Sequence, residues 1–157
     1  MTISSTLRDY IEQKGTPYET VPHHRTATTR QSALAAHVPG SQMAKSVVVH
    51  HGSGYALAVL PSTHRVELAT LQDILDKPLG LASEDEVASL FQDCDVGAVP
   101  PIGAAFDVPV VIDESLADGA DIYFEGGDHR TLVHVSGRDF RNLTSGAQVA
   151  RFSHPAV

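Results

Sequence analysis

The chain has 157 residues, of which 42% are hydrophobic and 19% charged, and this length suits one globular domain with a substantial buried core. Its 11 Lys and Arg against 19 Asp and Glu give a formal net charge of −8, which excludes a protein that coats the phosphates of a long DNA or RNA duplex. A local positive spot could still hold one short nucleic-acid end.

No apolar stretch reaches the roughly 18 residues that a membrane-spanning helix needs. The first 15 residues, MTISSTLRDYIEQKG, carry polar side chains where a signal peptide has its apolar centre. Cys94 is the one cysteine, which excludes an internal disulfide, and its neighbours Asp93 and Asp95 disfavour a thiolate. We therefore expect a cytoplasmic protein with no membrane partner and an inert thiol.

The first elements expected along the chain are two short helices. Residues 5–14 form an amphipathic pattern that stops at Gly15. A second helix is predicted from about residue 29 to residue 37, because Thr28 and Gln31 have capping-box spacing before it.

A β-hairpin is predicted next. Residues 45–50 contain the run VVV, the densest β-branched run of the first half of the chain, and residues 55–61 (YALAVLP) form the returning strand. The sequence HGSG at 51–54 between them is typical of a turn.

Two more helices are predicted over residues 70–77 and 83–91. Ser83 and Glu86 at the start of the second helix have the spacing of a capping box.

Short strands dominate the second half of the chain. They are predicted over residues 109–112, 121–125 and 131–135, with turn residues between the last two, and the polar residues from Ser145 onward are expected to fray. Helices early and strands late, without a steady βαβ alternation, predict an α+β fold: a single domain over residues 1–157, with a mixed β-sheet and flanking helices.

Several catalytic signatures are absent from the sequence: a phosphate-binding P-loop, a dinucleotide-binding GxGxxG, a GxSxG nucleophile elbow and a zinc-binding HExxH. Nine histidines are present, but His23–His24 and His50–His51 are adjacent pairs whose side chains point to opposite faces of an extended chain. His129 and His134 are five residues apart across a turn. We therefore expect no metal ion.

Lys45 is the first residue that stands out. It opens the VVV strand, where it shares a face with Val47 and Val49. An ammonium group beside so much apolar surface suits an anionic ligand such as one phosphate, although a strand-end lysine that reaches out to solvent has the same pattern.

The second such feature is the sequence GAVPPIG at residues 97–103. The Pro-Pro pair restricts two φ angles and the flanking glycines allow conformations that other residues avoid, which together give a stiff loop. The backbone N–H groups of Ala98, Val99, Ile102 and Gly103 could be held toward a ligand carbonyl or a water molecule, as in an oxyanion hole. The alternative is a rigid connector between a helix and a strand.

The lysine that opens an apolar strand (AKSVVV, 44–49), followed some fifty residues later by a GxVPPxG loop, resembles the YbaK-type aminoacyl-tRNA deacylases. The same domain is the editing insertion of bacterial prolyl-tRNA synthetases. His24 and the TATT stretch at 26–29 resemble the family's upstream pattern, and YFEGGDH at 123–129 lies where members carry a turn of small residues. The resemblance covers about residues 20–143.

This resemblance implies a trans-editing hydrolase that cleaves the ester between a wrong amino acid and the terminal adenosine of a tRNA, through a second site that admits small amino acids. It implies that Lys45 contacts the phosphate or ribose of that adenosine, and that the loop between Gly97 and Gly103 orients the scissile carbonyl and the attacking water. It implies no cofactor. The further substrate-binding residues it suggests are His24, Thr28, Val99, Pro100, Pro101, Ile102, Gly127 and His129.

The chain departs from the family at two places. Many members have Phe where this chain has Ile102, and some have a serine where it has Glu125–Gly126–Gly127. His129 and His134 are both candidates for a downstream polar residue that certain relatives use. These departures bear on which amino acid is removed.

Two other hypotheses follow from the same features. A non-catalytic module could use the pocket to bind a tRNA end or a nucleotide, and a hydrolase of another small ester or amide would not require RNA. The mischarged tRNA 3′ end is the expected partner, and an aminoacyl-tRNA synthetase is a further candidate partner.

Overall fold

The computed structural model describes residues 3–52 and 54–156, and within them the chain forms six α-helices and ten strands. The α-helices are α1 (Ser5–Gln13), α2 (Thr29–Ala35), α3 (Leu68–Leu75), α4 (Glu84–Leu90), α5 (Glu114–Ala117) and α6 (Gly137–Leu143). Two 3₁₀ turns, η1 (Gly40–Gln42) and η2 (Gly103–Phe106), interrupt the loops. The strands are β1 (Glu19–Pro22), β2 (Met43–His51), β3 (Gly54–Pro61), β4 (His64–Val66), β5 (Gly80–Leu81), β6 (Val110–Asp113), β7 (Asp121–Glu125), β8 (Thr131–Ser136), β9 (Gln148–Ala150) and β10 (Ser153–Pro155).

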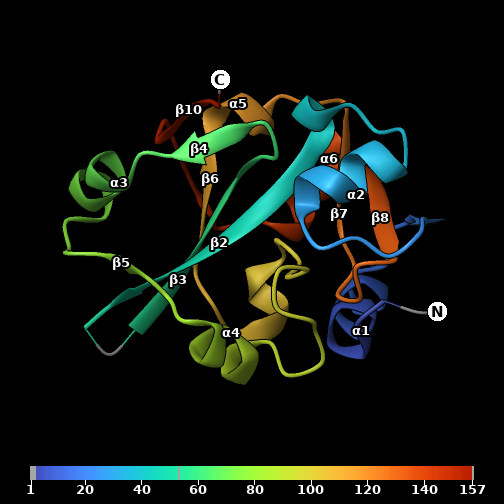
Figure 1. The fold of residues 1–157 in the computed structure, drawn as a ribbon, viewed down its shortest axis with the longest axis horizontal. Coiled ribbons are helices and arrows are strands. Elements are labelled where there is room, and N and C mark those ends of the chain that lie inside the picture. The colour runs from blue at the N-terminus through green and yellow to red at the C-terminus, as the bar shows by residue number, and fades with distance from the viewer. Residues whose placement is uncertain (1–2, 53, 157) are drawn as a thin grey trace.

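The main sheet has the strand order β1-β8-β7-β2-β3-β6-β9, with β5 added to β2 (Figure 1). Its pairs are antiparallel except for β2–β7, β3–β6 and β6–β9, which are parallel. The strands β4 and β10 form a separate two-stranded sheet. This mixed sheet with flanking helices confirms the predicted α+β class.

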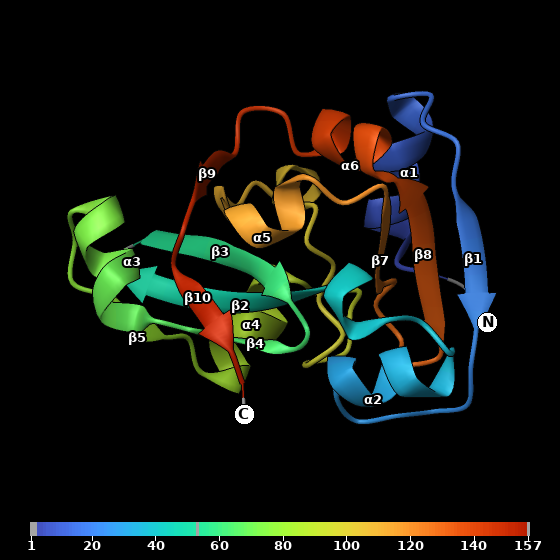
Figure 2. The same cartoon turned by 90° about the horizontal axis from the view of Figure 1, so that it is seen from above.

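The hairpin of β2 and β3 runs diagonally across the view of Figure 1, and Figure 2 shows the two strands side by side. Its register pairs Lys45 with Leu60, and Lys45 is on the predicted face of β2, because side chains of a strand alternate. Both strands are longer than the sequence predicted. The predicted turn at 51–54 includes Ser53, which lies outside the described residues.

Side-chain caps fix the start of α2 and α4, whereas α3 has no side-chain cap among the described residues. Ser83 Oγ accepts from Glu86 N while Glu86 Oε1 accepts from Ser83 N, which is the complete capping box expected for α4. At α2, Thr28 Oγ1 accepts from Gln31 N at 3.1 Å, but the Gln31 side chain accepts from Ala27 N instead of Thr28 N. The predicted helix over 70–77 begins two residues earlier, at Leu68. None of the described helices is long and apolar enough to span a bilayer.

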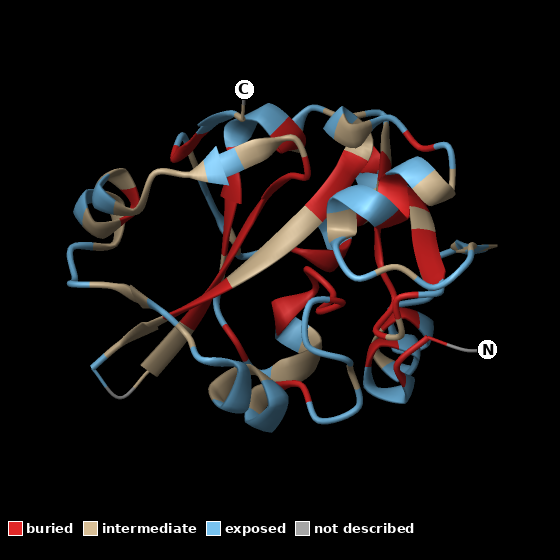
Figure 3. Cartoon of the chain, viewed as in Figure 1, coloured by how far each residue is buried: buried red, intermediate tan, exposed pale blue. Residues whose placement is uncertain are grey.

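The core is divided by the main sheet. On one side, Ala44 and Val48 of β2 pack with the loop residues Val99 and Ile102 and with residues of α1 and α6. On the other side, Val49 packs in a second cluster together with residues of β3, α3 and β6. Figure 3 shows the buried residues concentrated along β2, β3, β6, β7 and β8.

The prediction that the chain frays from Ser145 onward is wrong within the described residues. Strand β9 pairs in parallel with β6, and β10 pairs with β4. Phe152 between them is fully buried, its N–H donates to Asp113 Oδ1 at 2.9 Å, and its carbonyl accepts from Glu67 N at 2.7 Å. Two strands of three residues carry almost no sequence signal, and this one aromatic anchor holds them against the domain.

Candidate active site

Lys45 lies in a pocket of about 360 Å³ at the junction of β2, α2 and the β4–β10 sheet. Its Nζ donates to the carbonyl oxygen of His64 at 2.6 Å. Ser46 also lines the pocket, and its buried Oγ has no hydrogen-bond partner among the described residues. We call this the Lys45 pocket, and the residues that line it are Thr28, Thr29, Arg30, Lys45, Ser46, Ser62, His64, Arg65 and Ala156.

The Lys45 pocket is electropositive in an acidic protein. Burial lowers the pKa of Lys45, and the nearby cations Arg65 and Arg30 lower it further. No acidic residue is among those that line the pocket, and within the described residues none of the three cations has a carboxylate within 4.0 Å. A pocket with this charge and several hydroxyl groups suits a phosphate or a similar anion.

The loop from Gly97 to Gly103 is largely buried. Val99, Pro100, Pro101 and Ile102 are all buried, and the peptide bonds before both prolines are trans. Ile102 is fully buried in the core, so its side chain is not available to stack on a base. A Cβ on Gly103 would collide with the carbonyl oxygen of Val108, which explains why this position requires glycine.

The loop has fewer unbonded N–H groups than the sequence suggested. Ala98 N donates to Asp95 O at 3.0 Å, which removes it from the predicted set. The amides of Val99, Ile102 and Gly103 donate to no other residue that the structure describes. Gly97, with a φ of +92°, turns the chain into this segment. Three amides of the predicted set therefore have no acceptor among the described residues, and all three belong to buried residues.

The structure does not place the Lys45 ammonium in contact with this loop. None of the loop residues lines the Lys45 pocket. The loop packs in the core with Ala44 and Val48, whose side chains lie on the face of β2 opposite to that of Lys45. The segment at the start of α2 connects the two features. A Cβ on Gly97 would lie 3.5 Å from Ala27 O, and Thr28, the next residue, lines the Lys45 pocket.

A buried polar cluster of Ser32, Glu125 and His129 connects α2, the end of β7 and the loop from Gly97 to Gly103. Ser32 Oγ donates to Glu125 Oε2 at 2.9 Å, which ties α2 to the end of β7. His129 Nε2 donates to the carbonyl of Val96 at 3.0 Å, which ties the turn after β7 to the loop. His129 Nδ1 lies 4.0 Å from Glu125 Oε2, and neither this nitrogen nor Glu125 Oε1 has a hydrogen-bond partner among the described residues.

Glu125 is the residue of this region that the sequence analysis missed. Burial raises the pKa of its carboxyl to about 7; the hydrogen bond from Ser32 opposes this rise and the charge of Asp128 adds to it. It is 1% exposed. The only sequence signal for this burial is that Glu125 ends the apolar strand DIYFE and precedes two glycines. A glutamate at such a strand end is ordinarily expected in solvent.

The remaining predicted residues have different surroundings. His24 is exposed. Gly127 does not line the Lys45 pocket: its carbonyl accepts a hydrogen bond from Asp95 N, and a Cβ at this position would touch Ser4 and Cys94. His134 stacks on the Tyr123 ring and bonds to two carboxylates on the sheet surface. Burial lowers the pKa of His134, but these carboxylates, Asp121 and Glu19, outweigh it and raise the pKa.

Other parts of the chain offer fewer chemical groups. Within residues 3–52 and 54–156, no group of three or more His, Cys, Asp or Glu side chains is placed to hold a metal ion. Burial raises the pKa of the Cys94 thiol to about 12, with the two neighbouring aspartates adding to the effect and a hydrogen bond from Ser4 opposing it. The raised pKa agrees with the expected inert thiol, but its main cause is burial, and the expected effect of Asp93 and Asp95 is smaller.

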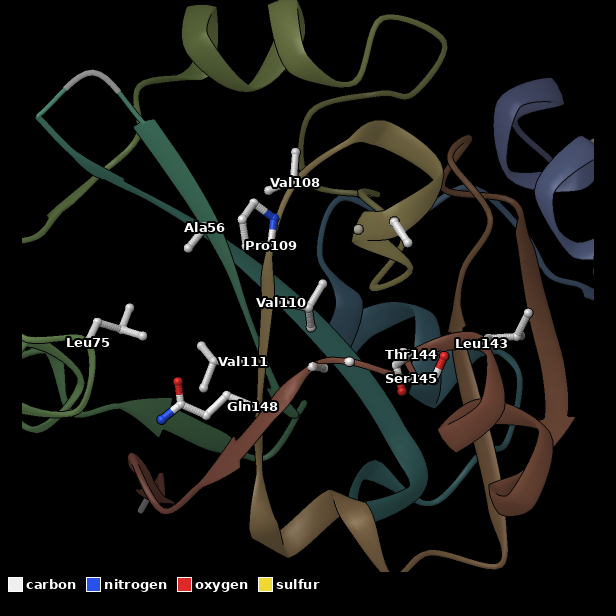
Figure 4. Close-up of a pocket in the computed structure, with 14 residues that line it drawn as sticks. Ala56, Leu75, Val108, Pro109, Val110, Val111, Leu143, Thr144, Ser145 and Gln148 are labelled. Atoms are coloured by element: carbon white, nitrogen blue, oxygen red, sulfur yellow. The ribbon is translucent and has the colours of Figure 1, made fainter.

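A second pocket, of about 350 Å³, lies between β6, β9 and α3 (Figure 4). Its side chains are mostly apolar, among them Val108, Val110, Val111 and Leu143, and no ionisable residue lines it. It therefore lacks the charge that an anionic substrate needs, and the Lys45 pocket is the better candidate for the site.

The chain is similar in sequence to a known domain family and in structure to several solved proteins. Residues 23–143 match the sequence profile of the aminoacyl-tRNA editing domain. A solved structure described as a candidate trans-editing enzyme for prolyl tRNA synthetase superposes with a TM-score of 0.84 at 27% identity, covering 96% of each chain. The structure of a hypothetical protein superposes with a TM-score of 0.84 at 26% identity over 96% of this chain and 100% of the other. A scaffold from a study of epitope grafting by computational design superposes with a TM-score of 0.85 at 27% identity, over 96% of this chain and 97% of the scaffold. No curated protein sequence matches the chain.

Proposed function

Since the chain belongs to the aminoacyl-tRNA editing domain family, which deacylates mischarged tRNA, we propose that it is a trans-editing hydrolase that removes a small amino acid from the 3′ end of tRNA. The observation that carries the proposal is the Lys45 pocket, where three cations and four hydroxyl side chains surround a space of about 360 Å³ in a protein of net charge −8. One RNA end needs only such a local positive site.

In this proposal the terminal adenosine binds with its phosphate or ribose at Lys45, and Thr28 lines the same pocket. The ester then extends toward the loop between Gly97 and Gly103. The amides of Val99, Ile102 and Gly103 orient the scissile carbonyl and stabilise the oxyanion that forms on it.

The hydrolysis needs no side-chain nucleophile. Water adds to the carbonyl carbon, the bond from that carbon to the ribose oxygen breaks, and a proton passes to the ribose oxygen with help from the neighbouring ribose hydroxyl. An aminoacyl ester is already activated, so positioning and backbone donors are sufficient.

A panel of purified mischarged tRNAs tests the proposal. Ala-, Cys- and Ser-tRNA of several acceptors are incubated with the protein, and the released amino acid is measured. We expect multiple turnovers on at least one of these small amino acids, because a second editing site of this kind admits small side chains. Saturable binding with no product from any of them would reject hydrolysis in favour of a binding module.

Chelation tests the proposed metal independence. The protein is treated with a strong chelator, the chelator is removed, and hydrolysis is measured between pH 6 and 8 with and without added Zn²⁺. We expect an unchanged rate, because backbone donors and substrate hydroxyls need no metal-activated water. A rate that falls and recovers with zinc would contradict the mechanism and direct attention to His129 and His134.

Two further parts of the proposal concern the surroundings of the protein. An enzyme that acts in trans meets its substrate where charged tRNA is found, which points to the cytoplasm. An aminoacyl-tRNA synthetase that selects the tRNA is a natural partner. Co-purification of the synthetase with this protein in the presence of mischarged tRNA tests this association.

A further inference from the structure

Lys45 is not alone in its pocket: Arg30 and Arg65 come from two other elements and line the same space. Arg30 is the second residue of α2, and Arg65 is the central residue of β4. Both side chains are exposed at the rim, whereas Lys45 is partly buried. The chain has only 11 basic residues, and three of them meet at this one place.

Arg30 occupies a position where a cation is unfavourable without a ligand. It lies in the first turn of α2, where the backbone dipole favours negative charge, and no acidic residue is in that turn. It has no carboxylate within 4.0 Å among the described residues, and it repels Lys45. No ion pair among the described residues therefore explains this arginine.

Arg65 is held in place by the C-terminal part of the chain. In the β4–β10 sheet it pairs with His154, and the preceding carbonyl of His64 accepts the hydrogen bond from Lys45. Ala156 N donates to Thr63 O at 2.8 Å, and Ala156 lines the pocket. The segment after β9 thus builds the rim that presents Arg65 next to the lysine.

We propose that Arg30 and Arg65 bind the phosphodiester groups that precede the terminal adenosine of the substrate RNA. This inference rests on the proposed function and extends it from the reacting nucleotide to the nucleotides before it. Of the three cations, Lys45 lies deepest in the pocket, so the terminal nucleotide binds there. The phosphates of the nucleotides before it then lie next to the two arginines at the rim. A guanidinium group binds a phosphate through two parallel hydrogen bonds, which suits this role.

The test compares two substrates that carry the same ester. One is the mischarged tRNA that the panel identifies, and the other is adenosine carrying the same amino acid on its ribose, with no phosphate. The variants are Arg30→Gln, Arg65→Gln and the double variant. Arg138→Gln is the matched control, because Arg138 is an exposed arginine on α6 outside the pocket.

For the tRNA substrate, each arginine variant should raise KM roughly tenfold with little change in kcat, because a charged hydrogen bond to a phosphate is lost. The slope of log KM against log salt concentration should fall by about 0.7 for each phosphate contact removed. For the adenosine ester, which has no phosphate, kcat/KM should fall much less than it does for the tRNA. The Arg138→Gln variant should match the unmodified protein on both substrates.

Two outcomes would overturn the inference. One is a KM and a salt slope for tRNA that the arginine variants leave unchanged. The other is an equal loss on tRNA and on the adenosine ester, which would show that the arginines act on the fold or on the reaction itself. If the unmodified protein hydrolyses neither substrate, the proposed function fails separately. Binding of uncharged tRNA, followed by fluorescence anisotropy, then decides: equal affinity in the variants rejects the role of the arginines, and the tenfold loss supports it.

Discussion

Replacing Lys45 by alanine should lower kcat/KM for a mischarged tRNA by about 30- to 1000-fold while the fold is retained. Loss of a charged contact in a partly desolvated pocket costs about 2–4 kcal/mol in the transition state, which gives this range. The fold should tolerate the change, because the ammonium makes one hydrogen bond, to His64 O, and is repelled by Arg30 and Arg65.

Single-turnover hydrolysis of the mischarged tRNA and thermal unfolding measure the two effects together. Lys77→Ala is the control, because Lys77 is exposed and lies outside the Lys45 pocket. A Lys45→Ala variant with the rate of the unmodified protein would show that the lysine only reaches out to solvent. A variant that no longer unfolds cooperatively would assign it a structural role.

The Glu125→Gln variant should be more stable than the unmodified protein above pH 7, and the advantage should disappear in acid. Burial holds the pKa of Glu125 near 7, whereas an unfolded glutamate titrates near 4.5. Between these values the folded protein binds the extra proton, so stability falls as pH rises through this window, by about 3 kcal/mol in total. Glutamine cannot ionise and still accepts the hydrogen bond from Ser32.

Urea unfolding of both proteins from pH 4 to pH 8.5 measures this difference. Carboxylates with lowered pKa, such as Glu67 and Asp113, are present in both proteins and cancel in the comparison. Glu86→Gln is a useful control: a hydrogen bond from the Ser83 backbone and one from Tyr55 lower its pKa, so the stability that this variant lacks relative to the unmodified protein is fully present above about pH 4.5 and is lost only as the pH falls below that value. A stability difference for Glu125→Gln that stays constant with pH would mean that Glu125 has the same pKa in the folded and unfolded states, and would contradict the raised pKa.

The sequence predicted the elements whose physics is local. The run VVV and the apolar return strand determine the β2–β3 hairpin, and the face of Lys45 follows from the alternation of side chains along a strand. Ser83 and Glu86 place the start of α4 because the capping box is a contact within four residues. The strand over 121–125 agrees exactly with β7.

The elements that depend on distant partners could not be predicted in this way. The parallel pairs β2–β7 and β3–β6 join segments more than fifty residues apart, and no local pattern encodes that order. Strands β9 and β10 form around the burial of Phe152, which looks in the sequence like one aromatic residue in a polar tail.

The residues of the candidate site divide in the same way, into those with a local sequence signal and those without one. Lys45 and the loop around Pro100 and Pro101 have visible signals, an isolated cation on an apolar strand and a stiff Pro-Pro segment. Glu125 does not, because its burial depends on Ser32 of α2 packing over the end of β7. The rim position of Arg65 likewise depends on the C-terminal strand, so the sequence could not bring it to Lys45.

The central claim is that this chain hydrolyses the ester of a mischarged tRNA. The most direct measurement is a mass balance on the best substrate of the panel, in which free amino acid and intact uncharged tRNA are quantified per mole of protein. We expect many equivalents of both products in equal amounts, and their loss in the Lys45→Ala variant. Saturable binding of the charged tRNA, with at most one equivalent of amino acid released, would contradict the claim and identify a binding module.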